Sequence, residues 1–102
     1  MSILHTVNKS PFERNSLESC LKFAAPGAAV LLIEDGVYAG LRDTTAVPLI
    51  ADALERVKIY VLGPDLKARG FAAERLIPGI GVVDYAQFVA MAVEHAKVQA
   101  WL

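Results

Sequence analysis

A continuous apolar segment at residues 28–33 constrains the fold of this 102-residue chain more than any other feature. The segment reads AAVLLI and does not alternate between apolar and polar side chains, so it predicts a strand buried on both faces. Such strands occur inside parallel sheets that helices cover on both sides. Even with Gly27 included, the segment is far too short to span a bilayer, so we expect no membrane segment.

Strand and helix patterns alternate along the rest of the chain. The predicted strands are residues 3–7, 28–33, 58–62 and 80–83, with a short extended piece at 37–39, and the predicted helices lie near residues 10–25, 43–54, 64–69 and 84–96. Residues 71–78 are expected to be irregular or to form a further short helix. This rhythm predicts one domain over residues 1–102, a three-layer α/β/α fold around a mostly parallel sheet of about four to five strands.

Capping signals mark the ends of the predicted helices. Residues 10–13 read SPFE, a capping box with proline at the first helical position, and residues 15–18 offer a second signal one turn later. The start of the first helix is therefore left open between the two. For the last helix, residues 84–87 carry an Asp and a Gln at capping-box spacing, so we expect it to begin there.

The composition is unusually apolar for a short chain. Hydrophobic residues make up 55% of it, against the ~45–50% typical of soluble domains. Alanine accounts for part of the excess, but we expect exposed apolar surface that a partner covers. The chain has ten Lys and Arg residues against eleven Asp and Glu residues, and it has no run of basic residues. We therefore expect no direct contact with nucleic acid.

Cys20 is the only cysteine, which excludes an intrachain disulfide and a zinc site built on paired cysteines. It is also the only candidate thiol nucleophile. A reactive thiol needs a lowered pKa, but no cation stands three or four positions away, and Leu17, Leu21 and Ala24 share its helix face. We favour a packed residue over a working thiol, and both interpretations stay open. A single free cysteine and the lack of a signal-peptide pattern suit a reducing, cytoplasmic location.

Two further groups of polar residues are candidates for a site. Glu34 and Asp35 follow the buried strand, where open α/β sheets place their ligands, but a solvated turn ending in Gly36 is the favoured interpretation. His5 and His95 share no catalytic or metal-binding spacing. No glycine-rich nucleotide fingerprint occurs either, so we expect no cofactor and no metal.

The sequence closes on Trp101 and Leu102, an apolar pair that a free, solvated tail does not usually carry. Tryptophan commonly anchors interfaces between proteins. We therefore name Trp101 and Leu102 as candidate interface residues. Docking of the same residues into the chain's own core is an equally supported alternative.

Five phrases of the sequence, taken together and in order, resemble the DsrH/TusB family. They are LHTVNKSPF at residues 4–12, LLIEDGVYA at 31–39, IYVLGPDLKARG at 59–70, VVDYAQFVAMAVEH at 82–95, and AW at 100–101. The resemblance covers nearly the whole chain. It implies a parallel α/β/α fold like that of the DsrEFH proteins.

The resemblance also implies partners. Family members are small subunits of heterohexameric sulfurtransferase complexes, DsrEFH in sulfur oxidation and TusBCD in the synthesis of 2-thiouridine in tRNA. The expected partners are DsrE/TusD-like and DsrF/TusC-like subunits and a DsrC/TusE-like sulfur acceptor. The principal persulfide-carrying cysteine is expected on the DsrE/TusD-like subunit. Cys20 matches a cysteine in the first helix of DsrH-type members, which favours the sulfur-oxidation branch.

The leading hypothesis is thus a mainly structural and binding subunit of a sulfur-oxidation complex of the DsrEFH type, in which Cys20 could serve as an auxiliary persulfide thiol. Whether the chain is itself an enzyme is left open. One alternative is a TusB-type subunit in tRNA 2-thiouridine synthesis. Others are a subunit in which Cys20 is an obligatory persulfide carrier, and a stand-alone domain that binds a ligand at Glu34 and Asp35.

Overall fold

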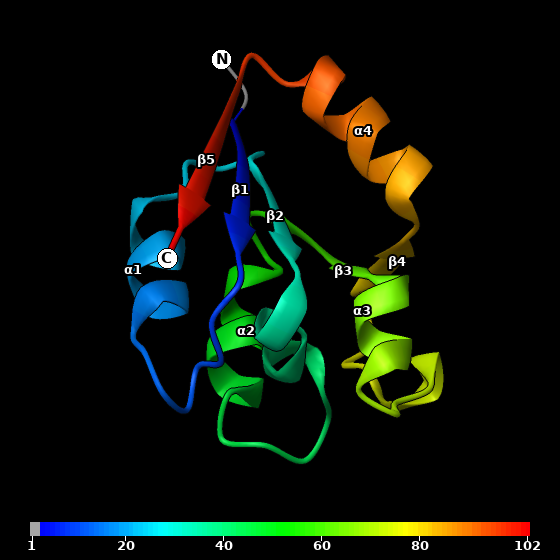
Figure 1. Ribbon diagram of the computed structural model, residues 1–102. Helices are drawn as coiled ribbons and strands as arrows, with labels where there is room; N and C mark the ends of the chain where they lie inside the picture. The colour runs from blue at the N-terminus through cyan, green and yellow to red at the C-terminus, as the bar shows by residue number, and fades with distance from the viewer. Residues whose placement is uncertain (1–2) are drawn as a thin grey trace.

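Five parallel strands form the centre of the computed structural model, which describes residues 3–102 (Figure 1). The strands are β1 (Ile3–Val7), β2 (Ala29–Leu32), β3 (Lys58–Leu62), β4 (Gly81–Val83) and β5 (Lys97–Trp101). Their order across the sheet is β4-β3-β2-β1-β5, and every neighbouring pair is parallel. The prediction of an α/β fold with a mostly parallel sheet is confirmed.

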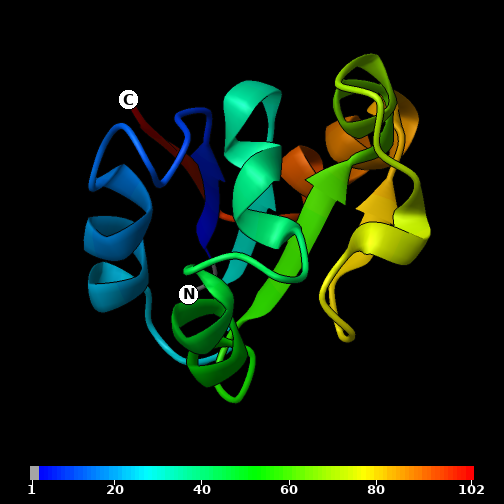
Figure 2. The same ribbon diagram turned by 90° about the horizontal axis from the view of Figure 1, so that it is seen from below.

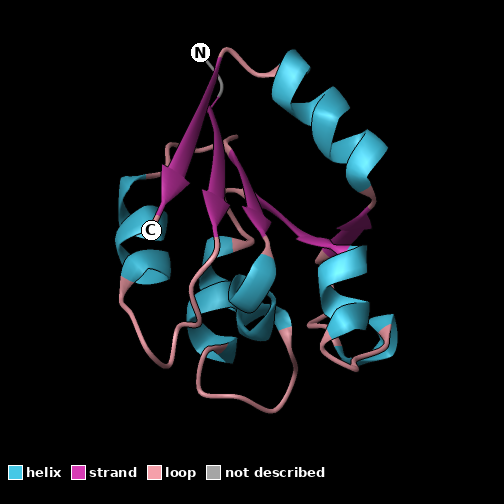
Figure 3. Ribbon diagram, viewed as in Figure 1, coloured by secondary structure: helices cyan, strands magenta, loops and turns pink. Residues whose placement is uncertain are grey.

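Helices cover both faces of the sheet (Figures 2 and 3). They are α1 (Ser16–Phe23), α2 (Val47–Ala53), α3 (Gly63–Ala68) and α4 (Tyr85–Glu94), with 3-10 helices η1 (Glu34–Gly40) and η2 (Ala73–Arg75). One face packs against α1, α2, α3 and η1 in the larger apolar cluster, and the other packs against α4 in a smaller cluster. None of the helices in residues 3–102 is long and apolar enough to cross a membrane.

The central strand β2 explains the layered arrangement. Val30 and Leu32 belong to the larger cluster, whereas Ala29 and Leu31 belong to the smaller one. All four are at most 4% exposed, so the strand is buried on both faces, as its unbroken apolar run predicts.

The structure settles where two helices begin. For α1 it selects one of the two capping signals, and for α2 it shows a later start than the sequence predicts. Helix α1 begins at Ser16, after Asn15, so the later signal marks its start, and the Ser10 hydroxyl instead accepts a hydrogen bond from the Phe12 N–H within a turn. Helix α2 begins at Val47, a few residues later than predicted, because the Thr44 hydroxyl accepts a hydrogen bond from the Ala46 N–H and holds a turn there.

Helix α4 begins where its capping signal predicts. The Asp84 carboxylate accepts a hydrogen bond from the Gln87 N–H at 2.7 Å, and the Gln87 side chain accepts one from the Asp84 N–H at 2.8 Å. This reciprocal pair satisfies two donors that a helix start otherwise leaves unpaired.

The extended piece predicted at residues 37–39 is wrong, because these residues belong to η1. The chain turns as soon as it leaves β2, where the Gly36 N–H donates to the Ile33 carbonyl at 2.8 Å. Gly36 also lies directly against the Val7 carbonyl, where a Cβ atom would clash, so only glycine fits this close approach.

The last strand, β5, was not predicted. Residues 97–101 pair in parallel with β1, with Trp101 beside Val7, and make β5 an edge of the sheet. The short segment KVQAW offers a weak strand pattern, and its pairing joins residues more than ninety positions apart. Such a long-range contact leaves little trace in the local sequence.

Candidate functional site

Cys20 lies on the inward face of α1 and is 0% exposed. It packs in the same apolar cluster as Leu17, Leu21 and Ala24, the neighbours that the helical spacing indicates. Burial raises the pKa of the Cys20 thiol to about 12. At neutral pH the side chain is therefore a thiol with almost no thiolate, the form that attacks sulfur.

Trp101 docks on its own chain. Its indole N–H donates a hydrogen bond of 3.0 Å to Nδ1 of His5, a residue that is 0% exposed. Phe23 completes an aromatic cluster, with ring centroids 5.7 Å from Trp101 and 6.0 Å from His5. Trp101 itself is only partly buried, so part of its ring remains accessible beside the exposed Phe23.

This hydrogen bond fixes the form of the imidazole. Because Nδ1 of His5 accepts from Trp101, the neutral ring carries its proton on Nε2. Burial lowers the pKa of His5 and so favours the neutral ring. Nε2 is buried and has no hydrogen-bond partner within residues 3–102.

Leu102 follows β5 and is 80% exposed, and its carbonyl accepts a hydrogen bond of 2.9 Å from the Ser16 hydroxyl. The two candidate interface residues thus differ: Trp101 packs partly inward, whereas Leu102 is mostly exposed. His95 lies at the C-terminal end of α4, where its Nδ1 atom is 2.6 Å from the Met91 carbonyl oxygen. That contact gives His95 a structural role at the end of α4.

A cavity of about 400 Å³ opens beside His5. It is lined by Ile3, His5, Phe23 and residues 25–28, so it contains no carboxylate, ammonium or guanidinium group. Such a lining suits an apolar group and offers nothing to hold a phosphate. No cluster of three or more His, Cys, Asp or Glu able to hold a metal ion occurs within residues 3–102.

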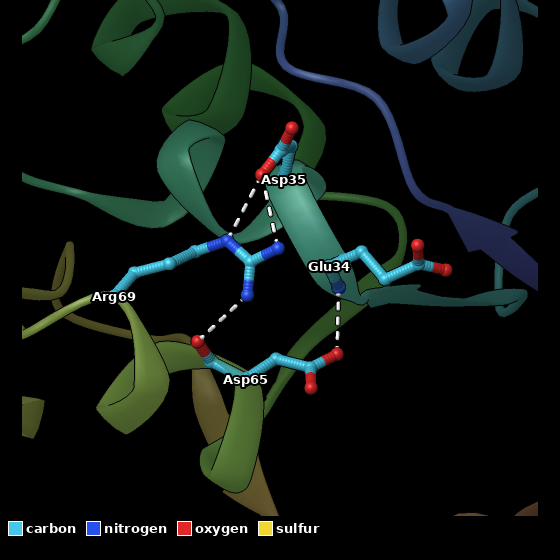
Figure 4. Close-up of polar contacts among 4 residues, drawn as sticks. All are labelled: Glu34, Asp35, Asp65 and Arg69. Carbon is cyan, nitrogen blue, oxygen red and sulfur yellow. Dashed lines mark hydrogen bonds and ion pairs between the residues drawn. The ribbon is translucent and has the colours of Figure 1, made fainter.

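The carboxyl edge of the sheet holds a polar cluster that joins the β2–η1 turn to α3 (Figure 4). Both Nε and a terminal nitrogen of Arg69 lie 3.0 Å from Asp35 Oδ1, and Arg69 also donates to the Asp65 carbonyl at 3.2 Å. The Asp65 carboxylate accepts a 2.7 Å hydrogen bond from the N–H of Glu34. Glu34 has φ +49°, a conformation that costs non-glycine residues energy, so this hydrogen bond supports a strained turn.

These contacts agree with a turn at Glu34 and Asp35 rather than a ligand site, because the Asp35 carboxylate is already paired with a guanidinium. The sequence alone does not assign this role to Asp65 or Arg69. Their four-residue spacing in the phrase LGPDLKARG places both on one side of α3. Their partners in the β2–η1 turn become visible only in three dimensions.

Comparison with known proteins identifies the family to which the chain belongs. The sequence profile of the family described as "DsrH like protein" matches residues 9–98. The chain is 42% identical over 99 residues to Protein TusB of Erwinia tasmaniensis and 37% identical over 100 residues to Protein TusB of Pectobacterium parmentieri. Each alignment covers 97% of this chain and 100% of the relative. The chain belongs to the DsrH/TusB family.

Solved structures agree with the DsrH/TusB assignment at the level of the fold. The ychN protein of Escherichia coli superimposes with a TM-score of 0.82 at 19% identity, covering 98% of both chains. A protein of unknown function from Methanobacterium thermoautotrophicum gives a TM-score of 0.74 at 15% identity, covering 96% of this chain and 97% of its own. These structures show the fold alone. The family profile and the TusB relatives confirm the resemblance that the sequence phrases indicated, and with it a place among DsrH/TusB sulfur-relay subunits.

Proposed function

We propose that this chain is a TusB-type subunit of a heterohexameric, cytoplasmic sulfur-relay complex that serves 2-thiouridine synthesis in tRNA. The observation that carries the proposal is the full-length similarity to relatives named Protein TusB, at up to 42% identity. The sulfur-oxidation role, which the match of Cys20 to DsrH-type members favoured, has less support. It rests on one buried residue, whereas the relatives match along the whole chain.

The chain's own part in the relay is structural and binding. In persulfide transfer, a thiolate attacks the terminal sulfur of a donor persulfide, the donor S–S bond breaks, and the donor leaves as a thiolate. The acceptor thiolate then takes the terminal sulfur from the new persulfide in the same way. Cys20 is buried and carries almost no thiolate at neutral pH, which argues against an obligatory step at this residue.

As the family resemblance implies, the carrier cysteine belongs to a DsrE/TusD-like partner, and a DsrC/TusE-like protein is the acceptor. A DsrF/TusC-like subunit completes the complex. Trp101 and Leu102 are proposed contact residues for these partners, supported by the exposure of Leu102 and of Phe23 beside Trp101. Trp101 and Leu102 lie at the β5 edge of the sheet, beyond which no further strand of residues 3–102 pairs.

The test is genetic, in the source organism. Deletion of the gene should abolish 2-thiouridine in tRNA, measured by mass spectrometry of digested tRNA, and the wild-type gene should restore it. A Cys20→Ala copy should restore it too. Intact 2-thiouridine in the deletion strain, with loss of growth on reduced sulfur compounds, would contradict the proposal and support the sulfur-oxidation role.

A further inference from the structure

Helix α4 is apolar on the side that faces the sheet and on a neighbouring flank that is exposed to solvent. On the inner side, Phe88, Met91 and Ala92 pack against the smaller apolar cluster of the sheet. Within residues 85–94 the only charged side chain is Glu94, at the end. A helix without a polar outer face is normally buried in a larger structure.

One flank of α4, next to its sheet-facing side, carries a continuous apolar stripe. Tyr85, Val89 and Val93 recur every four residues, so they share one face of the helix. They are 58%, 63% and 78% exposed, among the most exposed large apolar side chains in residues 3–102. We call these three residues the α4 stripe. Its exposure contrasts with the full burial of the β2 strand in the same domain.

The layer to which α4 belongs is incomplete. The opposite face of the sheet packs against α1, α2, α3 and η1, whereas α4 is the one helix that packs on this face within residues 3–102. Val98 and Ala100 of β5 point to the same face as Leu4 and Thr6, their partners in the register, yet both are exposed. In Figure 1, the end of α4 and the start of β5 meet at the top of the molecule, and the two elements diverge from there, α4 to the right and β5 to the left. Parallel sheets are covered on both faces, so this side lacks a helix.

We infer that the α4 stripe, together with the exposed β5 side chains Val98 and Ala100, receives an apolar helix from a different subunit of the complex. The inference rests on the proposed function, which supplies such partners. The expected element is a helix, because helices cover the faces of parallel sheets and the uncovered part of this face, at β5, lies next to helix α4. The partner's contact face must be uncharged, since the stripe offers no group to pair with a charge.

The charges at the two ends of α4 argue against a second copy of this chain. If two copies of α4 packed antiparallel about a two-fold axis near Val89, Asp84 of one would meet Glu94 of the other. Like charges brought together across an interface disfavour the pairing. Glu94 forms no ion pair within residues 3–102, so it is available to a basic residue of a different chain. The expected partner helix is therefore apolar, with neutral or basic ends.

The test uses the chain co-expressed with its two sister subunits. A Val89→Lys/Val93→Lys variant adds two charges to the stripe at positions that are already exposed, so circular dichroism should show an unchanged fold. Native mass spectrometry should show binding to the sister subunits weakened at least tenfold. The matched control is Phe12→Lys, at a 55%-exposed apolar residue in the loop before α1, and it should assemble like the wild type.

The outcomes separate this inference from the proposed function. If the wild type assembles and the double-lysine variant assembles equally well, or if Phe12→Lys weakens assembly as much, the α4 surface is not the docking site although the proposed function stands. If the wild type binds no sister subunit, the proposed function fails and this inference with it. A wild-type homodimer that the two lysines dissociate, without binding of sister subunits, would assign the surface to a second copy and overturn the inference.

Discussion

At the scale of single residues, burial decides what Cys20 can do. A free cysteine inside an apolar cluster behaves as a small hydrophobic side chain, and its thiol ionises only when the surroundings stabilise the charge. Here burial raises the pKa of Cys20 to about 12. Two properties follow that can be measured on the purified chain, namely its reaction with alkylating agents and its stability at high pH.

Alkylation by iodoacetamide at pH 7.5 should be slow for folded Cys20. Because the folded thiol is inaccessible and almost fully protonated, we expect a rate roughly 100-fold or more below that of the chain unfolded in urea. Mass spectrometry of samples quenched over time gives both rates. Comparable rates in the two states would show that Cys20 is accessible and ionised, and would revive the working thiol.

The free energy of unfolding should fall at high pH because of Cys20. The unfolded thiol ionises near pH 8.5, whereas the folded one stays protonated up to about 12. The contribution to stability is thus fully present below about pH 8.5 and is lost as the pH rises toward 12. Between pH 8 and 10.5 the wild type should lose about 2 kcal/mol more than a Cys20→Ala variant in urea titrations. Equal losses in the two proteins would mean that the folded thiol ionises normally.

At the scale of elements, α3 holds the turn that follows β2. Asp65→Ala removes the acceptor of the Glu34 N–H, a contact of 2.7 Å that supports a strained backbone. We expect the free energy of unfolding to fall by about 1 kcal/mol, the usual value of one hydrogen bond. Asp52→Ala, at an exposed carboxylate on α2, is the control and should change little. An unchanged stability of the Asp65 variant would remove the structural role given to this contact.

Strand β5 offers a second test at this scale. Trp101→Ala should lower the chain's own free energy of unfolding by about 2 kcal/mol, less than for a fully buried tryptophan, because Trp101 is only partly buried. Leu102→Ser should leave that free energy within about 0.5 kcal/mol, since Leu102 is 80% exposed. If Leu102 contacts a partner, the same change should weaken assembly with the sister subunits in analytical ultracentrifugation. Unweakened assembly would take Leu102 out of the proposed interface.

At the scale of the whole molecule, the sequence predicts most of the fold. The apolar run at residues 28–33 and the alternation of strands and helices are local patterns, and they suffice to indicate the layers and the parallel sheet. The pairing of β5 with β1 and the contacts of Arg69 with Asp35 join distant residues, so local patterns cannot reveal them. The same limit applies to Cys20, whose helix face the spacing predicts but whose complete burial depends on the opposing sheet.

The most direct test of this account follows sulfur through the assembled complex. The complex is loaded with a persulfide donor that carries labelled sulfur, and the label on each subunit is measured by mass spectrometry before and after the acceptor is added. We predict label on the cysteine of the DsrE/TusD-like subunit, none on Cys20, and undiminished transfer to the acceptor in a Cys20→Ser complex. Stoichiometric label on Cys20, with transfer lost in the Cys20→Ser complex although it remains assembled, would contradict the account and make Cys20 an obligatory sulfur carrier.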